Sequence, residues 1–415
     1  MQNWKRNLWI LVVCQFIVAS AMTMIIPFLP LYLKDLGVEN EASIHVWTGV
    51  IFGANFLTAF LFSPFWGRMA DKHGRKLMIL RSGFGMAIVI GLTGFATGPV
   101  ALLMLRLLNG VVSGFIPASI GLVSTNTPKE KVGYALGILQ SGAVAGGIIG
   151  PLLGGLMAEV FGFQTIFFVT GASILLAALV VLFFVHERFV PKKEPQKSNS
   201  LIDFKIVTKK QPVLSLYIVI FFIQFAVMGV NPLLSLYVGE LTPHQNTAFF
   251  AGLTVAVLGF SNMMSSAFLG RVSDKKGAHN VLFCAMIGVA ILSIPQAFVT
   301  DIWMLIGLRF LLGICVGGLL PAANMLIRLH SPVGMESRTY GFSNSFMYLG
   351  NMLGPILGGW LATTFTIRGL FIISAIILFI NVWIVKFKVM PSAKKTFIEE
   401  KKLRMKKRSE SPSPS

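Results

Sequence analysis

Apolar runs of about 20 residues recur along the whole chain, and they restrict what it can fold into. A run of this length crosses the hydrocarbon core of a bilayer as one α-helix. Of the 415 residues, 55% are hydrophobic and only 12% are charged, and the mean hydropathy is +0.76. A soluble domain of this size needs more polar residues to cover its surface. The chain is therefore predicted to be an all-α membrane protein with many spans.

The apolar runs divide into twelve predicted transmembrane helices, six on each side of a polar, lysine-rich stretch that contains Pro191 and Pro195. We interpret this stretch as a cytoplasmic linker. The predicted domains are an N-terminal six-helix half (1–186), the linker (187–211), a C-terminal six-helix half (212–390) and a basic cytoplasmic tail (391–415). The predicted spans are 7–33, 44–66, 77–97, 99–121, 134–158, 163–186, 213–238, 246–269, 280–299, 302–326, 339–363 and 367–388.

Lysine and arginine residues segregate to one side of these spans. With the N-terminus placed inside, the opposite side holds only Lys34 and Arg368, whereas the inner loops and the tail hold nearly all the others. Positively charged loops remain in the cytoplasm. We therefore expect both termini to be cytoplasmic and the protein to lie in the cytoplasmic membrane. This distribution accounts for the net charge of +19 without nucleic acid as a partner.

The two halves repeat each other in sequence. Four motifs recur in the same order, and two such parallel repeats build a transporter with its site at their interface. The matched pairs are Pro27-x4-Tyr32 with Pro232-x4-Tyr237, GRMADKHGRK from Gly67 with GRVSDKKGAH from Gly270, Arg106-x3-Gly110 with Arg309-x3-Gly313, and Gly146-x3-Gly150-Pro151-x2-Gly154 with Gly350-x3-Gly354-Pro355-x2-Gly358.

These motifs resemble those of the major facilitator superfamily over essentially the whole chain. GRMADKHGRK is similar to its loop 2–3 signature, LRLLNG with Gly114 to its span-4 signature, and Gly146–Gly155 to the span-5 signature of antiporters. Span 1, MTMIIPFLPLYLKDLG, resembles the 12-span drug:proton antiporters, in particular Gram-positive multidrug pumps that export fluoroquinolones. The resemblance implies the major facilitator fold and efflux of lipophilic drugs by alternating access, with proton antiport. Export of one specific metabolite or sugar on the same fold is the alternative.

Two kinds of motif are candidates for gating. The segment from Gly67, which includes Asp71 and Arg75, is interpreted as a tight polar turn with a copy around Asp274. We hypothesise that Asp71 is a latch that meets the positive N-terminal end of span 11 only when the cytoplasmic side is closed. Glycine–proline segments bend helices and let neighbours approach closely; ordinary helix packing is the alternative role. Their gating candidates are Gly146, Gly150, Pro151, Gly154, Gly354 and Pro355.

Two basic residues, Arg106 and Arg309, lie well inside predicted spans, where an unpaired charge is costly. The resemblance implies that Arg106 faces the central cavity and changes partner as a proton moves, whereas snorkelling to the interface is the alternative for both residues. All sixteen acidic residues lie in loops, in the linker, in the tail or near span ends. Asp35 and Glu159 remain as coupling candidates, with a solvated rim charge as the alternative, and the sequence does not identify the proton carrier.

Amide side chains within the spans are candidates for the lining of a substrate cavity. Together with 35 Phe and 19 Met, they suit a cavity that accepts varied amphiphilic molecules. The alternative for each is a hydrogen bond to a neighbouring helix. Because no acid is embedded, we expect neutral or zwitterionic substrates rather than dications. The candidates are Gln15, Asn109, Gln140, Gln224, Asn231, Asn262, Asn324, Asn344 and Asn351.

Other classes of membrane protein fit the sequence less well. No GxxxxGK[ST] loop occurs, which argues against an ATP-driven pump. All six histidines lie in loops or at span ends, so no catalytic or metal-binding set is expected at membrane depth, and the protein is predicted not to be an enzyme. We expect no cofactor and no metal. The expected partners are a small-molecule substrate, protons and the lipid bilayer, and the expected state is a monomer.

Overall fold

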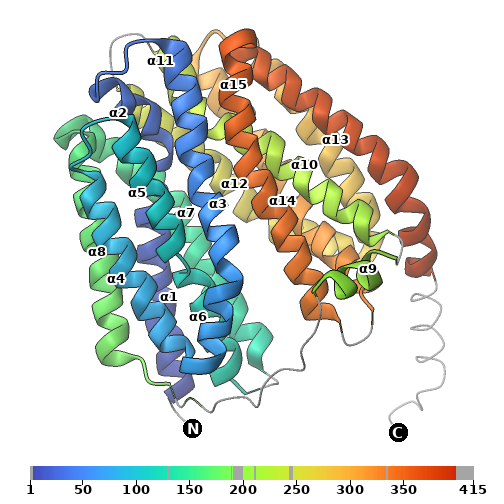
Figure 1. Ribbon diagram of the computed structural model, residues 1–415. Helices are drawn as coiled ribbons and strands as arrows, with labels where there is room; N and C mark the ends of the chain where they lie inside the picture. Colours follow the sequence, from blue (N-terminus) through green and yellow to red (C-terminus); the bar gives the residue numbers. More distant parts are fainter. Residues whose placement is uncertain are drawn as a thin grey trace, which may run out of the picture.

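The computed structural model describes residues 3–128, 131–187, 189, 200–209, 212–242, 246–332 and 335–398. These residues form a bundle of long helices, most of them roughly aligned with one another (Figure 1), and no strand occurs among them. Eleven helical segments are long and apolar enough to cross a membrane. The predicted all-α membrane fold is therefore confirmed.

The first half of the bundle, α1 to α8, makes six crossings. Two of them are interrupted, one by a 3₁₀ turn and the other by two non-helical residues. In chain order the elements are α1 (Asn3–Met24) with η1 (Ile26–Phe28) and α2 (Leu29–Asp35), α3 (Glu41–His73), α4 (Arg75–Thr93), α5 (Pro99–Val112) with α6 (Phe115–Asn126), α7 (Val132–Phe161) and α8 (Phe163–Phe184).

The second half, α10 to α15, repeats this arrangement. Its last helix counts as one segment but contains two crossings, because the backbone at Thr366 is non-helical (φ 62°) and the chain reverses direction there (Figure 1). The elements are α10 (Val213–Val230) with η3 (Asn231–Leu233) and α11 (Leu234–Leu241), α12 (Thr247–Lys276), α13 (Ala278–Gln296), α14 (Ile302–His330), and α15 (Glu336–Ile384) with the π-helical turn η4 (Val385–Val389).

The segment from Gly67 is not a turn, and this part of the sequence-based prediction was wrong. Helix α3 continues through Gly67 and Asp71 to His73, and α12 likewise continues to Lys276. Polar residues do not end a helix once it has left the hydrocarbon. Each helix instead ends at one glycine, Gly74 (φ 95°) or Gly277 (φ 90°), because glycine adopts a positive φ without steric cost.

A short helix, α9 (Ser200–Lys209), lies inside the stretch that was interpreted as a linker. It packs on the beginning of α15, where the Asp203 carboxylate pairs with Arg338 at 2.9 Å and the rings of Phe204 and Phe342 lie 5.1 Å apart. The first described part of the predicted tail, residues 391–398, is also helical. Residues 1–2, most of the linker and residues 399–415 lie outside the described part of the chain.

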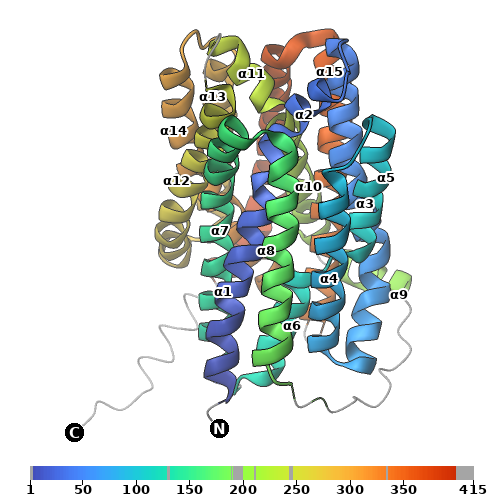
Figure 2. The same ribbon diagram turned by 90° about the vertical axis from the view of Figure 1, so that its left-hand side faces the viewer.

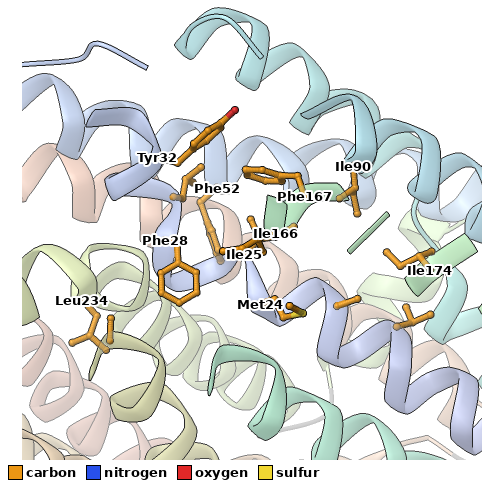
Figure 3. Packing of buried hydrophobic residues seen from close by; sticks show 14 of the residues in the cluster. Met24, Ile25, Phe28, Tyr32, Phe52, Ile90, Ile166, Phe167, Ile174 and Leu234 are labelled. Atoms are coloured by element: carbon orange, nitrogen blue, oxygen red, sulfur yellow. The ribbon is translucent and has the colours of Figure 1, made fainter. Parts of the chain in front are cut away.

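The larger hydrophobic core joins the two halves. Figure 3 shows Phe28 of the first half near Leu234, which comes from α11 of the second half and belongs to the same core. The ring of Tyr32 packs on Phe167, with centroids 4.9 Å apart, and its hydroxyl donates to the Thr93 carbonyl at 3.2 Å. In the second half, Tyr237 packs on Phe371 and donates to the Gln296 carbonyl in the same way. The repeat seen in sequence therefore extends to tertiary contacts.

Candidate functional site

The ends of the bundle differ in how the halves meet. We call the end where α1 begins and α3 ends the terminal end, and the opposite one the far end. In Figure 1, α3 and α15 lie close at the upper, far end and diverge toward the lower, terminal end. Figure 2 shows α7 beside α12, the other pair of helices that joins the halves.

Helices α3 and α15 touch through their backbones near the far end. A Cβ atom added to Gly49 would overlap the carbonyl oxygen of Pro355, and one added to Gly359 would overlap that of His45. One added to Gly53 would lie 2.7 Å from the Met352 carbonyl oxygen. Glycine is therefore required here for the helices to approach this closely.

Helices α7 and α12 make the same contact on the other side of the far end. A Cβ atom on Gly252 would overlap the Pro151 carbonyl oxygen, and one on Gly155 would lie 2.7 Å from the carbonyl oxygen of Ala248. Gly252 occupies the position in the second half that Gly49 occupies in the first. Both prolines of the repeated motif therefore direct a carbonyl at a glycine of the opposite half. Sequence reasoning named Pro151 and Pro355 but missed Gly252 and Gly49, the glycines that their carbonyl oxygens contact.

The remaining glycines of the motif face their own half. Added Cβ atoms on Gly146, Gly150 and Gly154 would meet the backbone or side chains of α1, and one on Gly354 would meet Phe225 of α10. The structure thus separates the predicted gating set. The prolines lie between the halves, whereas these four glycines pack each half internally.

The carboxylate of Glu159 adds a polar contact between the halves at the far end. Its Oε1 accepts from the backbone N–H groups of Ala248 (2.9 Å) and Phe249 (3.4 Å), in the first turn of α12. A carboxylate is stabilising there because the first N–H groups of a helix lack internal partners and carry partial positive charge. Glu159 is therefore a cap across the two halves, and not only a solvated rim charge. Asp35, at the end of α2, is exposed.

At the terminal end the same helices do not touch at their glycines. Added Cβ atoms would meet no other group within 4 Å, in contrast to the glycines near the far end. This holds on all four helices that join the halves, at Gly67, Gly133, Gly137, Gly270 and Gly341. The described structure is therefore closed at the far end and open at the terminal end.

A cavity of about 320 Å³ lies against the first half of the bundle. Its wall is mostly apolar, with side chains such as Met22, Ile26 and Phe52. The polar groups include Arg106, Thr23 and an amide pair in which Asn109 Nδ2 donates to Asn55 Oδ1 at 2.8 Å. This combination of a large apolar wall and few polar groups is typical of sites for small organic molecules.

The guanidinium of Arg106 forms part of this cavity wall. It lies 6.0 Å from the centre of the Phe167 ring, and its buried Nε atom has no hydrogen-bond partner in the structure. Among the described residues neither Arg106 nor its copy Arg309 forms an ion pair. The two copies differ, because Arg309 is only 3% exposed and lines a separate cavity of about 30 Å³ in the second half.

The other amide candidates are dispersed. Only Asn109 lines the larger cavity, and Asn231 lines the small one. Gln224 bonds to Asn351 at 3.2 Å, the packing role considered as the alternative. Gln15 is fully buried, Asn262 is half-buried, and the exposed candidates are Gln140, Asn324 and Asn344.

Arg81 is a third basic residue within a span, which the sequence reasoning missed. Its guanidinium stacks on the ring of Trp66 at 3.6 Å and donates to the carbonyl of Ser113 at 3.0 Å. Trp66 donates its indole N–H to the Val111 carbonyl at 2.7 Å. Both acceptors lie where α5 ends, so the two side chains satisfy carbonyls that the break with α6 leaves without helical partners. Arg81 lies within about two turns of Arg75, where α4 begins. In the sequence it therefore looks like an ordinary charge at the end of a span, which is why it was missed.

At the terminal end, the first copy of the loop motif is held by a carboxylate that sequence reasoning also missed. Glu187 accepts from the backbone N–H groups of Arg75 (3.0 Å) and Lys76 (2.7 Å), and so caps α4. The Asp71 carboxylate pairs with the Arg75 guanidinium within the motif, at 3.0 Å. Asp274 in the second copy is exposed. The only signal for Glu187 was its place as a single acid directly after span 6.

A bundle built from two repeated six-crossing halves is the architecture of a secondary transporter. The chain belongs to the Major Facilitator Superfamily, whose family model matches residues 11–298 and 216–412. The chain is 39% identical to "Multidrug resistance protein MdtG" of Dickeya zeae over 380 residues, which cover 91% of this chain and 93% of that protein. It is 38% identical to the protein of the same name from Salmonella dublin over 384 residues, which cover 91% and 94% of the two chains.

Solved structures show the same fold. A bacterial homologue of the human lysosomal transporter Spinster, in an inward-facing and occupied conformation, matches with a TM-score of 0.79 at 16% identity and covers 96% of this chain and 98% of that one. The nucleoside transporter NupG matches with a TM-score of 0.73 at 15% identity and covers 93% and 100% of the two chains. The predicted major facilitator fold is confirmed, and the chain is a transporter and not an enzyme.

Two neighbouring glycines of α7 allow packing within a half to be separated from closure between halves. We expect Gly155→Leu to keep the protein folded but open the far end, because its side chain meets α12 of the other half. Gly154→Leu instead meets α1, where overpacking costs about 2 kcal/mol of unfolding free energy. The measurements are thermal unfolding and the distance between spin labels at Glu39 and Asp301, in a variant without native cysteines. Equal losses of stability in both variants, with unchanged distances, would contradict this assignment.

Proposed function

We propose that this transporter exports lipophilic drugs and related organic compounds across the cytoplasmic membrane by alternating access, with protons moving inward. The observation that carries the proposal is the largely apolar cavity of about 320 Å³ with Arg106 in its wall. The relatives named as multidrug resistance proteins support the drug class. The two halves of one chain supply both sides of the transport path, which supports a monomer.

The cavity favours lipophilic compounds over a sugar or another highly hydroxylated metabolite. A sugar leaves many hydroxyl groups to be satisfied, and a buried polar group without a partner is costly. The wall offers few polar side chains, chiefly Arg106, Asn55, Asn109 and Thr23. Asn55 and Asn109 already bond to each other, through the Asn109 amide N–H and the Asn55 amide oxygen. Export of one specific metabolite is therefore the weaker candidate.

The charge of the wall favours neutral and zwitterionic compounds over dications. Arg106 is positively charged, and no Asp or Glu lines the cavity within the described part of the chain. A dication would meet this charge without a compensating carboxylate in a medium of low dielectric constant. A zwitterion can place its own carboxylate at the guanidinium.

The distribution of lysine and arginine supports a cytoplasmic location for the terminal end. In this orientation the described structure is open to the cytoplasm and closed toward the outside, the state that loads an exporter. Export then requires the terminal end to close and the contacts of Glu159, Gly155 and Gly359 at the far end to separate. The proposed Asp71 latch would act in that second state.

Accumulation of drugs in cells tests the proposed substrate class. We expect expression of the protein to lower cellular norfloxacin and ethidium severalfold in a strain without other efflux pumps, with a smaller effect on dicationic compounds. Arg106→Gln, which keeps a polar side chain but removes the charge, is expected to lose most norfloxacin export while reaching the membrane in equal amount. Unchanged accumulation of every drug, with export of a single metabolite, would favour the alternative.

Vesicles test proton antiport. Transport into inside-out vesicles should fall when the pH gradient is collapsed, because inward proton flow then no longer drives export. Glu159→Gln and Asp35→Asn are the variants to compare, since both acids lie at the far end and both are candidates for coupling. Full activity without any ion gradient would overturn antiport.

The repeated loop motif provides a matched test of the latch. We expect Asp71→Asn to slow transport at least tenfold at unchanged expression, because it removes the charge that would stabilise the closed terminal end. Asp274→Asn is expected to have a much smaller effect, since the second copy lacks the equivalents of Arg75 and Lys76. Transport assays at matched protein levels measure both, and equal effects would remove the asymmetry between the copies.

A further inference from the structure

Arg106 and Arg309 are copies of one position, but only Arg106 faces a large cavity. The Arg309 side chain is 3% exposed, and its Nε and Nη2 atoms are buried without a hydrogen-bond partner in the structure. It lines a space of about 30 Å³ inside the second half. This space can hold one or two water-sized species and is too small for an organic drug. Arg309 is therefore not a second copy of the substrate site.

The two arginines are surrounded by polar side chains at different repeat positions. Where the first half has an amide pair beside its arginine, the second half has leucines; where the first half has isoleucines, the second has polar side chains that line the small cavity. The corresponding pairs, aligned by the repeated motifs, are Ile26 with Asn231, Asn55 with Leu258, Ile90 with Ser293, and Asn109 with Leu312. The second half thus has a small chamber of its own at Arg309, in which a few polar side chains lie in a mostly apolar wall.

The charge of Arg309 has no ion-pair partner among the described residues. Glu240, a carboxylate of the same region, already pairs with Arg368 at 3.7 Å. The face of the Phe371 ring lies 5.6 Å from the guanidinium and offsets only part of the cost of a buried cation. Arginine does not lose its proton in proteins. A guanidinium buried in this way is stabilised by a small negative ion that fits beside it.

We propose that the chamber at Arg309 binds one small monovalent inorganic anion of halide size, with chloride as the physiological case. Arg309 supplies the positive charge and the two unpartnered N–H donors, and the side-chain amide of Asn231 lines the same space. The Ser293 hydroxyl donates to the Val289 carbonyl, and the unpartnered Gln296 Oε1 is an acceptor. The anion would therefore lie on the Arg309 and Asn231 side of the chamber. The ion would be a fixed structural element of the second half, whereas the substrate binds in the first. The proposal is independent of which compounds the protein exports.

The test is thermal unfolding of the purified full-length protein in sodium chloride, sodium bromide or sodium gluconate at equal ionic strength. Chloride and bromide should raise the unfolding midpoint saturably, by about 3 °C at about 100 times the dissociation constant, and gluconate should not because it is too large for the chamber. Arg309→Gln should abolish the difference between the salts. In gluconate this variant should melt at or above the wild-type midpoint, because it no longer buries an unpaired charge.

Arg106→Gln is the matched control and should keep the full response to chloride, since its cavity is separate. Bromide soaked into crystals should give an anomalous signal at Arg309 in the wild type and not in Arg309→Gln. Equal midpoints in chloride and gluconate for the wild-type protein would show that the chamber holds only water. A chloride response that persists in Arg309→Gln would place the anion elsewhere. Either result overturns the proposal.

Discussion

The structure depends on close backbone contact between helices of opposite halves at the far end. In a bilayer, apolar side chains gain little by leaving lipid, so helices associate through van der Waals contact at short range. Glycines at Gly49, Gly155, Gly252 and Gly359 allow that range by removing the Cβ atoms that would separate the backbones. At these four glycines one backbone meets the other without an interposed side chain. Such a contact can therefore separate and re-form, as alternating access requires.

The two halves use one fold for different purposes. Tyrosine–aromatic pairs hold both first crossings, through Tyr32 in one half and Tyr237 in the other, so the frame has been kept. Around Arg106 and Arg309 the helices are arranged alike, but the polar side chains lie at different repeat positions. In the first half, Asn55 and Asn109 place polarity in the wall of the large cavity. In the second half, Asn231 and Ser293 instead line the small chamber at Arg309.

Sequence reasoning found the features that are recorded in a single segment or in an exact repeat. Apolar run length predicted the all-α membrane fold, and the matched offsets predicted the repeat. Pro151 and Pro355, named as gating candidates, lie between the halves. The same reasoning missed contacts that depend on how distant helices face each other: the cross-half cap by Glu159, the stacking of Arg81 on Trp66, and helix α9. It also placed the loop turn at Gly67, because polarity shows where a chain leaves the membrane but not where a helix ends.

The acids that the structure describes lie near helix ends, where a carboxylate can cap a neighbouring helix. Glu159 caps α12 across the halves, and Glu187 caps α4 within one half. A carboxylate at a helix N-terminus contributes about 0.3–1 kcal/mol when exposed and up to about 2 kcal/mol when partly buried. The Glu159 contact requires a closed far end, and the proposed Asp71 contact requires a closed terminal end, so the two exclude each other. Each cap would thus stabilise one state by at most about 2 kcal/mol, an amount that differential binding of a substrate can offset.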